Sequence, residues 1–294
     1  MLALLVKPTL WESRRAKAVL EVLQTSGAAV LQGSNSVELS IELAALQVIY
    51  PDLTLVACGG DGTFHLALNS LPDLQIPIAV LPMGTGNDLA RYLGIKKLKL
   101  GIAALRNGAP VKMDMGTIES SDGSTRRFAG IASCGFDAQV NERANTYRGP
   151  AGTLKYLVAL AVELIKLNSR EFVVSTDGGG KITGRFTLIA VGNTSSYGGG
   201  LKMCPTANAF DQSFEVTYVD QVTRRLLVRV LPKVFWGGHT KHRQVTQNAV
   251  QKIQIGGDEF PVYADGEKVG HGPVVITLHP GAMRVWQAQP TNTP

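Results

Sequence analysis

The chain has 294 residues, of which 45% are hydrophobic and 18% are charged. This length predicts two domains of ordinary size, and the composition excludes a disordered chain, a collagen-like fibre and a coiled coil. The 29 Lys and Arg residues exceed the 23 Asp and Glu residues, and the net charge of +6 allows acidic partners without choosing among them.

The sequence predicts neither a signal peptide nor a membrane span. The apolar start at residues 1–6 is short, and no apolar run approaches the roughly 18 residues that cross a bilayer. Cys58, Cys134 and Cys204 are widely spaced and form no Cys-x-x-Cys motif, so we expect buried, reduced thiols. Together these features predict a cytoplasmic protein that at most visits the inner face of a membrane.

The first third of the chain alternates short apolar runs with stretches of helical length. The expected strands are 2–6, 28–31, 53–57 and 76–81, and the expected helices are 13–24, 36–49, 63–70 and 87–93. Strands that alternate with helices predict a parallel sheet covered on both faces.

The pattern changes after about residue 115, where strand-like runs are separated by polar turns. The expected strands are 127–131, 171–176, 186–191, 214–219, 252–255 and 274–278, and the expected helices are 154–167 and 224–236, the latter interrupted by Pro232. This pattern is typical of an antiparallel β-sandwich. We therefore predict an α/β domain over residues 1–115, followed by a β-sandwich domain over residues 116–290.

The motif Gly59-Gly60-Asp61-Gly62-Thr63 follows a buried strand and precedes a helix. Its glycines let the backbone approach a ligand, and their amides together with the helix N-terminus form an anion cradle. Asp61 beside phosphates suggests contact with a magnesium ion, directly or through water. The alternative is a plain strand-to-helix turn in which Asp61 is a capping residue.

A second glycine loop, Gly84-Thr85-Gly86-Asn87-Asp88, also follows an apolar strand and opens a helix. Ligands of open parallel sheets bind at the carboxyl ends of strands, so the two loops could line one cleft. The alternative makes Asn87 an N-cap and the glycines turn formers.

These two loops resemble the catalytic domain of the diacylglycerol kinase family, in particular its soluble bacterial lipid-kinase branch, which shares the domain with sphingosine and ceramide kinases. Gly135-Phe136-Asp137 and Tyr263-Ala264-Asp265-Gly266-Glu267 extend the resemblance over most of the chain. The motif at 59–63 alone also occurs in NAD kinases. The resemblance implies that ATP binds in a cleft between the two domains and that a lipid hydroxyl is phosphorylated.

Site residues follow from the resemblance. It assigns nucleotide contacts to Ser34, Gly59, Gly60, Asp61, Gly62, Thr63, Gly84, Thr85, Asn87 and Asp88. Glu267 would accept the proton of the lipid hydroxyl, and Asp265 and Asp61 would belong to an aspartate–water–Mg²⁺ network. A structural Mg²⁺ would be held by Asp211 and by the carbonyls of Asn208 and Ser213. Gln212 stands where the family has glycine, which predicts an altered turn.

The residues themselves support a paired carboxylate site. Asp265 and Glu267 are two positions apart and would share one face of a strand. In such a pair, each carboxylate can raise the pKa of the other toward neutrality, and the two can hold a cation. One carboxylate could also accept the proton that an alcohol loses when it attacks a phosphate. The alternative is an exposed hairpin turn, because Asp-Gly is a common turn dipeptide.

Residues 224–252 carry seven Lys and Arg side chains and no acid. Arg225, Arg229 and Lys233 share a helical face, and Phe235 and Trp236 follow. Such a segment suits an anionic membrane surface. The alternative is a core-facing helix with an ordinary solvated basic face.

The sequence therefore predicts an ATP- and Mg²⁺-dependent lipid kinase of lipid metabolism and phospholipid biosynthesis, with a diacylglycerol-like substrate at the membrane surface. Two alternatives stay open: a kinase of NAD or of another small alcohol, and a catalytically silent nucleotide- or lipid-binding regulatory protein. No nucleic-acid recognition module is recognisable, so nucleic acid is not an expected partner. Both a monomer and a homodimer are compatible with the sequence.

Overall fold

The computed structural model describes residues 1–146 and 153–288. The chain forms two compact units: the first contains Met1–Met113 and the segment that begins at Gly281, and the second contains Asp114–Pro280. The expected division at 115/116 lies two residues further along. The segment after Pro280 belongs with the first unit because strand β13 runs on past that residue and pairs with β4 through Val285 and Ile78.

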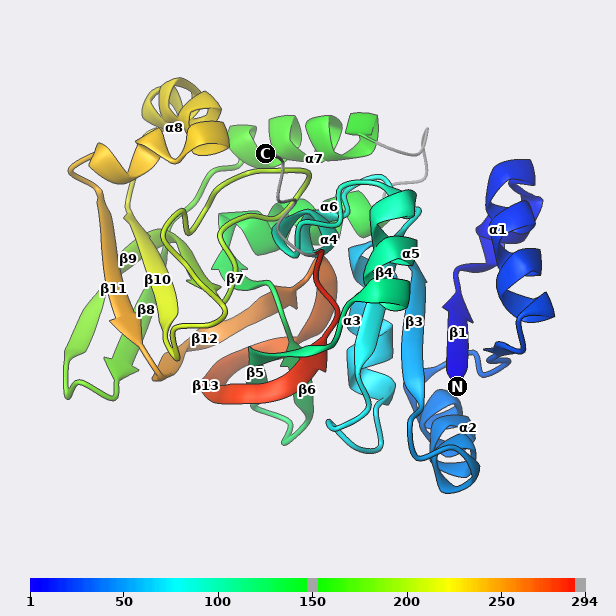
Figure 1. Cartoon of the computed structure of the whole chain (residues 1–294). Coiled ribbons are helices and arrows are strands. Elements are labelled where there is room, and N and C mark those ends of the chain that lie inside the picture. The colour runs from blue at the N-terminus through cyan, green and yellow to red at the C-terminus, as the bar shows by residue number, and fades with distance from the viewer. Residues whose placement is uncertain (147–152, 289–294) are drawn as a thin grey trace, which may run out of the picture. The chain divides into compact units, whose positions relative to one another are not determined.

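The first unit is an α/β unit built on a parallel sheet (Figure 1). Its strands are β1 (Leu2–Val6), β2 (Ala29–Val30), β3 (Thr54–Gly59) and β4 (Ile78–Pro82). Its helices are α1 (Arg14–Thr25), α2 (Ser36–Ile49), α3 (Asp61–Ser70), α4 (Asp88–Tyr92) and α5 (Leu98–Asn107), with a 3₁₀ turn at Pro8–Glu12. Every strand and helix expected here is confirmed to within a few residues. Helix α5 was not predicted.

The strand order β2-β1-β3-β4 indicates where a ligand would bind to this sheet. The chain moves from β1 to β2 on one side and then crosses back to β3 and β4 on the other. The order therefore reverses between β1 and β3, and ligands of open α/β sheets bind at such a switch point. All six residues of β3 are buried, so this strand holds the following loop on a rigid base.

Hydrophobic side chains of α1 and α5 cover one face of this sheet. Leu20 of α1 packs with Leu4, Val56 and Leu81, and Ile102 of α5 packs against the same cluster. The amphipathic spacing of α1 that suggested a helix is the spacing that buries this face.

The second unit is mainly antiparallel. Its strands are β5 (Val111–Ser120, which starts in the first unit), β6 (Thr125–Phe128), β7 (Ile131–Gly135), β8 (Arg170–Thr176), β9 (Lys181–Gly192), β10 (Phe214–Asp220), β11 (Val245–Val250), β12 (Lys252–Ala264) and β13 (Glu267–Val285). Its helices are α6 (Phe136–Thr146), α7 (Thr153–Ile165) and α8 (Arg224–Val230), followed by the 3₁₀ turns η2 (Leu231–Trp236) and η3 (Gly238–Lys241).

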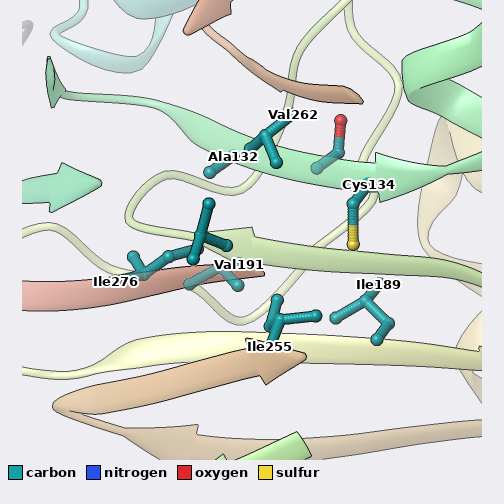
Figure 2. A pocket seen from close by; sticks show the side chains of 9 residues that line it. Ala132, Cys134, Ile189, Val191, Ile255, Val262 and Ile276 are labelled. Atoms are coloured by element: carbon teal, nitrogen blue, oxygen red, sulfur yellow. The ribbon is translucent and has the colours of Figure 1, made fainter. Parts of the chain in front are cut away.

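Two long strands connect the layers of this unit. β9 and β12 each pair with β8 over one half and with β7 over the other. Side chains from β9, β12 and β13 converge in the interior, among them Ile189, Val262 and Ile276 (Figure 2). The space between these side chains that a water-sized sphere could enter is about 0 Å³, so they form a packed core.

Several expectations for this unit need correction. The strand expected at 127–131 is broken at Ala129 and Gly130, whose amides bond to a side chain described below. Helix α6, strand β5 and strand β11 were not predicted. The helix expected at 224–236 begins as α8 and tightens into η2 at Pro232, which cannot donate to the helical ladder.

The expectations about cysteines and membrane spans can also be compared with the structure. Cys58, Cys134 and Cys204 are free and buried, as predicted. Among the helices described, none is long and apolar enough to cross a membrane.

Candidate active site

The two glycine loops of the first unit touch each other. A Cβ added to Gly84 would lie 2.5 Å from the Cα of Gly60 and 2.9 Å from its backbone nitrogen. Both Met83 and Gly84 donate backbone hydrogen bonds to the carbonyl of Gly59. The loops after β3 and β4 therefore form one continuous backbone surface, which neither loop could form with a side chain at the contact.

Asp61 holds this surface together. Its two carboxylate oxygens accept the backbone N–H groups of Asp88 and Leu89, each at 3.1 Å, so Asp61 caps the start of α4 from the neighbouring loop. Capping was the alternative role considered for Asp61 in the sequence. The helix that it caps is α4, however, and not α3, in which Asp61 itself lies. The amides of α4 are therefore occupied by a carboxylate.

The start of α3 is different, because its N-cap residue is Gly60, which has no side chain that could cap the helix. The first amide groups of a helix have no intrahelical acceptor and carry the positive end of its dipole. Gly60 precedes this turn and Gly62 lies within it. Thr63 sits directly against Gly59, since a Cβ there would lie 2.1 Å from the Thr63 hydroxyl oxygen. This end of α3 has the backbone geometry that the expected anion cradle requires.

Three polar side chains of the second loop, Thr85, Asn87 and Asp88, differ in the contacts that they make. Asn87, in the left-handed conformation, donates to the carbonyl of Gly84 and accepts from its amide. Asp88 is buried and pairs with Arg91 at 2.6 Å. Thr85 is exposed and makes no hydrogen bond within the described residues. Asn87 and Asp88 thus shape the loop, whereas Thr85 is free to meet a ligand.

Ser34 lies beyond β2, at the same edge of the sheet. Its backbone N–H and its hydroxyl both donate to one oxygen of Glu38 at 2.8 Å, and Asn35 caps α2. These bonds lower the pKa of Glu38, the bond from the Ser34 backbone most. In this structure Ser34 belongs to the start of α2, two strands away from β3.

Gly84→Ala tests the contact between the loops. The new methyl would meet the backbone of Gly60, which cannot rotate away, so the loops must separate. Overpacking of this kind costs about 1–3 kcal/mol, and we expect a lower melting temperature and an ATP affinity at least roughly tenfold weaker. Calorimetric titration with ATP measures the loss. Gly180→Ala is the matched control, because its methyl would make only an ordinary contact, 3.7 Å from the hydroxyl oxygen of Thr176. Unchanged ATP affinity in Gly84→Ala would contradict the cradle.

In the second unit, Asp265 and Glu267 do not share a strand face. Asp265 and Gly266 form the two-residue turn between β12 and β13, and both have positive φ, at 54° and 83°. The structure therefore adopts the alternative, a hairpin turn of the type that Asp-Gly favours, and the expectation of a strand pair is wrong. The carboxylate of Asp265 accepts the amides of Ala129 and Gly130 at 3.1 and 2.8 Å.

Glu267 stands out from its neighbours in this turn. It is the exposed first residue of β13, and within the described residues its carboxylate makes no hydrogen bond or ion pair. The next residue, Lys268, pairs with Glu142 of α6 at 2.7 Å and ties the strand to that helix. Glu267 is thus a carboxylate on a fixed backbone that is available to a ligand.

The turn at Asn208–Ser213 keeps the shape that a glycine would give it. Gln212 has φ 63°, so the expected alteration of the turn is not seen. One oxygen of Asp211 accepts from the amide and hydroxyl of Ser213, at 3.1 and 3.0 Å. A surface hollow of about 220 Å³ lies beside Asp211, Ser213 and the buried Glu215. Burial raises the pKa of Glu215 to about 7.

The donor chemistry of this turn fits a hard cation. A carboxylate and backbone carbonyls are oxygen ligands of the kind that Mg²⁺ takes, together with water. Among residues 1–146 and 153–288, no three His, Cys, Asp or Glu side chains are grouped so that they could hold a metal. A cation here would therefore depend on Asp211, the carbonyls of Asn208 and Ser213, and water.

Comparison with known proteins gives the family. Residues 12–118 match the family described as Diacylglycerol kinase catalytic domain. Residues 130–287 match the family described as YegS C-terminal NAD kinase beta sandwich-like domain. A diacylglycerol kinase of Mycobacterium tuberculosis is 35% identical over 245 residues, which cover 83% of this chain and 79% of that protein. This chain belongs to the diacylglycerol kinase family. The expected resemblance is confirmed, and the chain is a phosphotransferase that acts on an alcohol group.

Further relatives agree with the diacylglycerol kinase assignment. A diacylglycerol kinase of Staphylococcus carnosus is 26% identical, over 74% of this chain and 71% of that protein. A solved diacylglycerol kinase structure from Bacillus anthracis has a TM-score of 0.67 and 17% identity over 97% of this chain and 96% of its own. An NAD kinase from Archaeoglobus fulgidus, solved with ATP, has a TM-score of 0.54 and 14% identity, covering 98% and 94%. The two structures show a shared fold.

Two buried polar residues of this diacylglycerol kinase family member were missed by sequence reasoning. Asp114 accepts the amide of Gln212 at 2.8 Å. Asn193 donates to the carbonyls of Asp114 and Ala129, at 2.8 and 2.7 Å. Together they link the Asn208–Ser213 turn to the amides that hold Asp265. The signal was present for Asp114, a charged residue between two methionines, Met113 and Met115.

Asp137, in the family's glycine–phenylalanine–aspartate segment, is a half-buried acid at the start of α6. Burial raises its pKa, which hydrogen bonds from Ser133 (2.5 Å) and Tyr197 lower in part. The pKa of Asp137 is higher in the folded than in the unfolded protein. The free energy of unfolding therefore falls as the pH rises through the folded-state pKa. Asp137→Asn removes this titration, so its stability relative to wild type should rise between about pH 5 and about pH 8.

Urea unfolding at the two pH values measures the effect of Asp137→Asn. The matched control is Asp122→Asn, an exposed aspartate whose pKa is lowered by its bonds to Ser124. That control should show the same stability difference at both values, because Asp122 is already ionised throughout. A difference that does not change with pH for Asp137→Asn would show that the acid is ionised in the folded protein.

Proposed function

We propose that this enzyme uses ATP and Mg²⁺ to phosphorylate the hydroxyl of a diacylglycerol-like lipid. The observation that carries the proposal is the start of α3, which has a glycine at its N-cap and lies at the switch point of the sheet, where two glycine loops are in contact. It provides backbone donors for phosphate groups, and an exposed carboxylate in the second unit provides a proton acceptor.

On the nucleotide side, phosphoryl transfer depends on positioning and charge neutralisation. The amides around Gly60 and Gly62 point their donors at an anion, and Thr85 adds an uncommitted hydroxyl. Asp61 fixes the second loop against the first through α4. Asn87 and Asp88 contribute indirectly, because their side chains are bonded within the loop.

On the lipid side, Glu267 is the general base of the proposal. The attacking hydroxyl must lose its proton, and a carboxylate within hydrogen-bond reach can accept it. Asp265 fixes the turn that carries Glu267 by binding the amides of Ala129 and Gly130. The reaction requires the hydroxyl at Glu267 to meet the phosphates held at the start of α3.

Magnesium would neutralise the charge that develops on the transferring phosphate. Asp61 is the acid of the nucleotide loops that would serve such an ion in this proposal, directly or through water. Asp211, with the carbonyls of Asn208 and Ser213, would hold a structural ion that fixes the turn joined to Asp114.

A panel of acceptors tests the proposal. Purified protein is incubated with labelled ATP and Mg²⁺ and with diacylglycerol, phosphatidylglycerol, a sphingoid base, a polyprenol or NAD. We expect labelled phospholipid from diacylglycerol, and none when Mg²⁺ is chelated. Labelled NADP would favour the NAD kinase alternative. ATP binding without any turnover would favour a silent regulatory protein.

A further inference from the structure

Residues 224–243 form a basic segment that the proposed chemistry does not use. Its six Lys and Arg side chains are all exposed, and none forms an ion pair with a described acid; they are Arg224, Arg225, Arg229, Lys233, Lys241 and Arg243. No acidic residue occurs in the chain between Asp220 and Asp258. The segment therefore carries a positive charge that its own sequence does not neutralise.

Large apolar side chains project from the same segment. Val228, Phe235 and Trp236 are 54%, 56% and 65% exposed. Phe235 and Trp236 end η2, immediately before Gly237, which turns the chain with φ 75°. Adjacent exposed aromatic residues are unfavourable in water and mark a surface that meets a partner.

The segment is firmly attached to the second unit, so this exposure belongs to a fixed surface. Leu227 packs against the cluster of α6 and α7, and α8 lies beside α7 (Figure 1). The buried Val234 accepts a backbone bond from Lys202 at 3.0 Å, and the ring of the buried His239 bonds to the carbonyl of Met203 at 3.2 Å. Leu227, Val234 and His239 thus anchor the segment, while the cations and aromatics are exposed.

We propose that residues 224–243 dock the enzyme on an anionic lipid surface. The cations complement acidic headgroups, and Phe235 and Trp236 insert at the level where aromatic rings are favoured in bilayers. This inference rests on the proposed function, because it supposes that the acceptor is a membrane lipid.

Vesicle co-flotation tests the docking surface directly. Wild-type protein should bind vesicles that contain phosphatidylglycerol and not vesicles of phosphatidylcholine alone. The R225Q/R229Q/K233Q variant should lose at least roughly tenfold in partitioning. The matched control is K96Q/K97Q/K99Q, which removes three exposed Lys charges from the first unit. Equal loss in both variants would overturn the proposal, because binding would then follow net charge alone.

Brominated phosphatidylglycerol provides a second readout that does not depend on charge. The lipid should quench tryptophan emission of the wild type, and W236F should lose most of that quenching, since Trp236 is the exposed tryptophan of the segment. No quenching difference would overturn the insertion. Binding to a DNA duplex in preference to the vesicles would also overturn the proposal and assign the surface to nucleic acid.

A short-chain diacylglycerol dispersed in solution separates docking from catalysis. For R225Q/R229Q/K233Q, the ratio of turnover on vesicles to turnover on the dispersed lipid should fall by at least roughly tenfold. An unchanged ratio would overturn the docking surface while leaving the kinase proposal intact. Absence of turnover on either form of the lipid in the wild type would instead reject the proposed function.

Discussion

Glu267→Gln is expected to lower kcat by about 10²–10⁴-fold while leaving the affinity for ATP nearly unchanged. Glutamine has the size of glutamate but cannot accept the proton of an attacking hydroxyl. Glu267 makes no described hydrogen bond that the change would break, so the fold and the melting temperature should be preserved. Steady-state kinetics with saturating lipid, together with calorimetric ATP binding, measure both quantities.

The control for Glu267→Gln is Glu259→Gln, which removes the same charge from an exposed glutamate of β12 in the same hairpin. Its kcat should stay near that of wild type. A Glu267→Gln enzyme with near-normal kcat would remove Glu267 from the mechanism and leave Asp265 as the remaining acid of the turn.

Asp265→Asn separates positioning from metal organisation. Asparagine places an NH₂ group where one of the amides of Ala129 and Gly130 needs an acceptor. We therefore expect a lower melting temperature together with a lower kcat. If Asp265 also serves the aspartate–water–Mg²⁺ network, the Mg²⁺ concentration for half-maximal ATP binding will rise as well. An unchanged Mg²⁺ dependence will limit Asp265 to positioning Glu267.

Asp61→Asn is expected to lower kcat at least roughly 100-fold, or about 2.7 kcal/mol of barrier. One of the N–H groups of Asp88 and Leu89 would face an NH₂ group, and hydrogen bonds to a charged group contribute about 1.5–3 kcal/mol. The second loop would then lose its fixed position against the first, although the rest of the unit should still fold.

Kinetics and Mg²⁺ titration of Asp61→Asn distinguish its two roles. A lower kcat with an unchanged Mg²⁺ requirement would show that Asp61 acts only as a cap. A lower kcat with a higher Mg²⁺ requirement would show that Asp61 also belongs to the aspartate–water–Mg²⁺ network. Activity within about threefold of wild type, or ~0.6 kcal/mol of barrier, would contradict both roles.

The sequence predicted those parts of the site whose geometry is local. The glycine loops after β3 and β4 were predictable because an apolar strand, a glycine motif and a helix follow one another in the chain. Helix α6 was missed because its residues are largely polar, so its few apolar side chains, which pack against α7, give no clear helical pattern.

The long-range contacts of the site could not be predicted in this way. Asp61 bonds to amides 27 and 28 positions later, and Asp265 to amides more than 130 positions earlier. No local pattern encodes such pairs. The turn at Asp265 was one of two open alternatives, and the bonds to Ala129 and Gly130 stabilise that alternative over a continuous strand.

The identity of the product is the most direct test of the account. Wild-type and Glu267→Gln protein are each incubated with ATP, Mg²⁺ and diacylglycerol in phosphatidylglycerol vesicles, and the lipids are analysed by mass spectrometry. The account predicts that the wild type converts diacylglycerol to its phosphorylated form and that the variant does so at least roughly 100-fold more slowly. Unmodified diacylglycerol in the presence of wild-type protein that binds both ATP and the vesicles would contradict it.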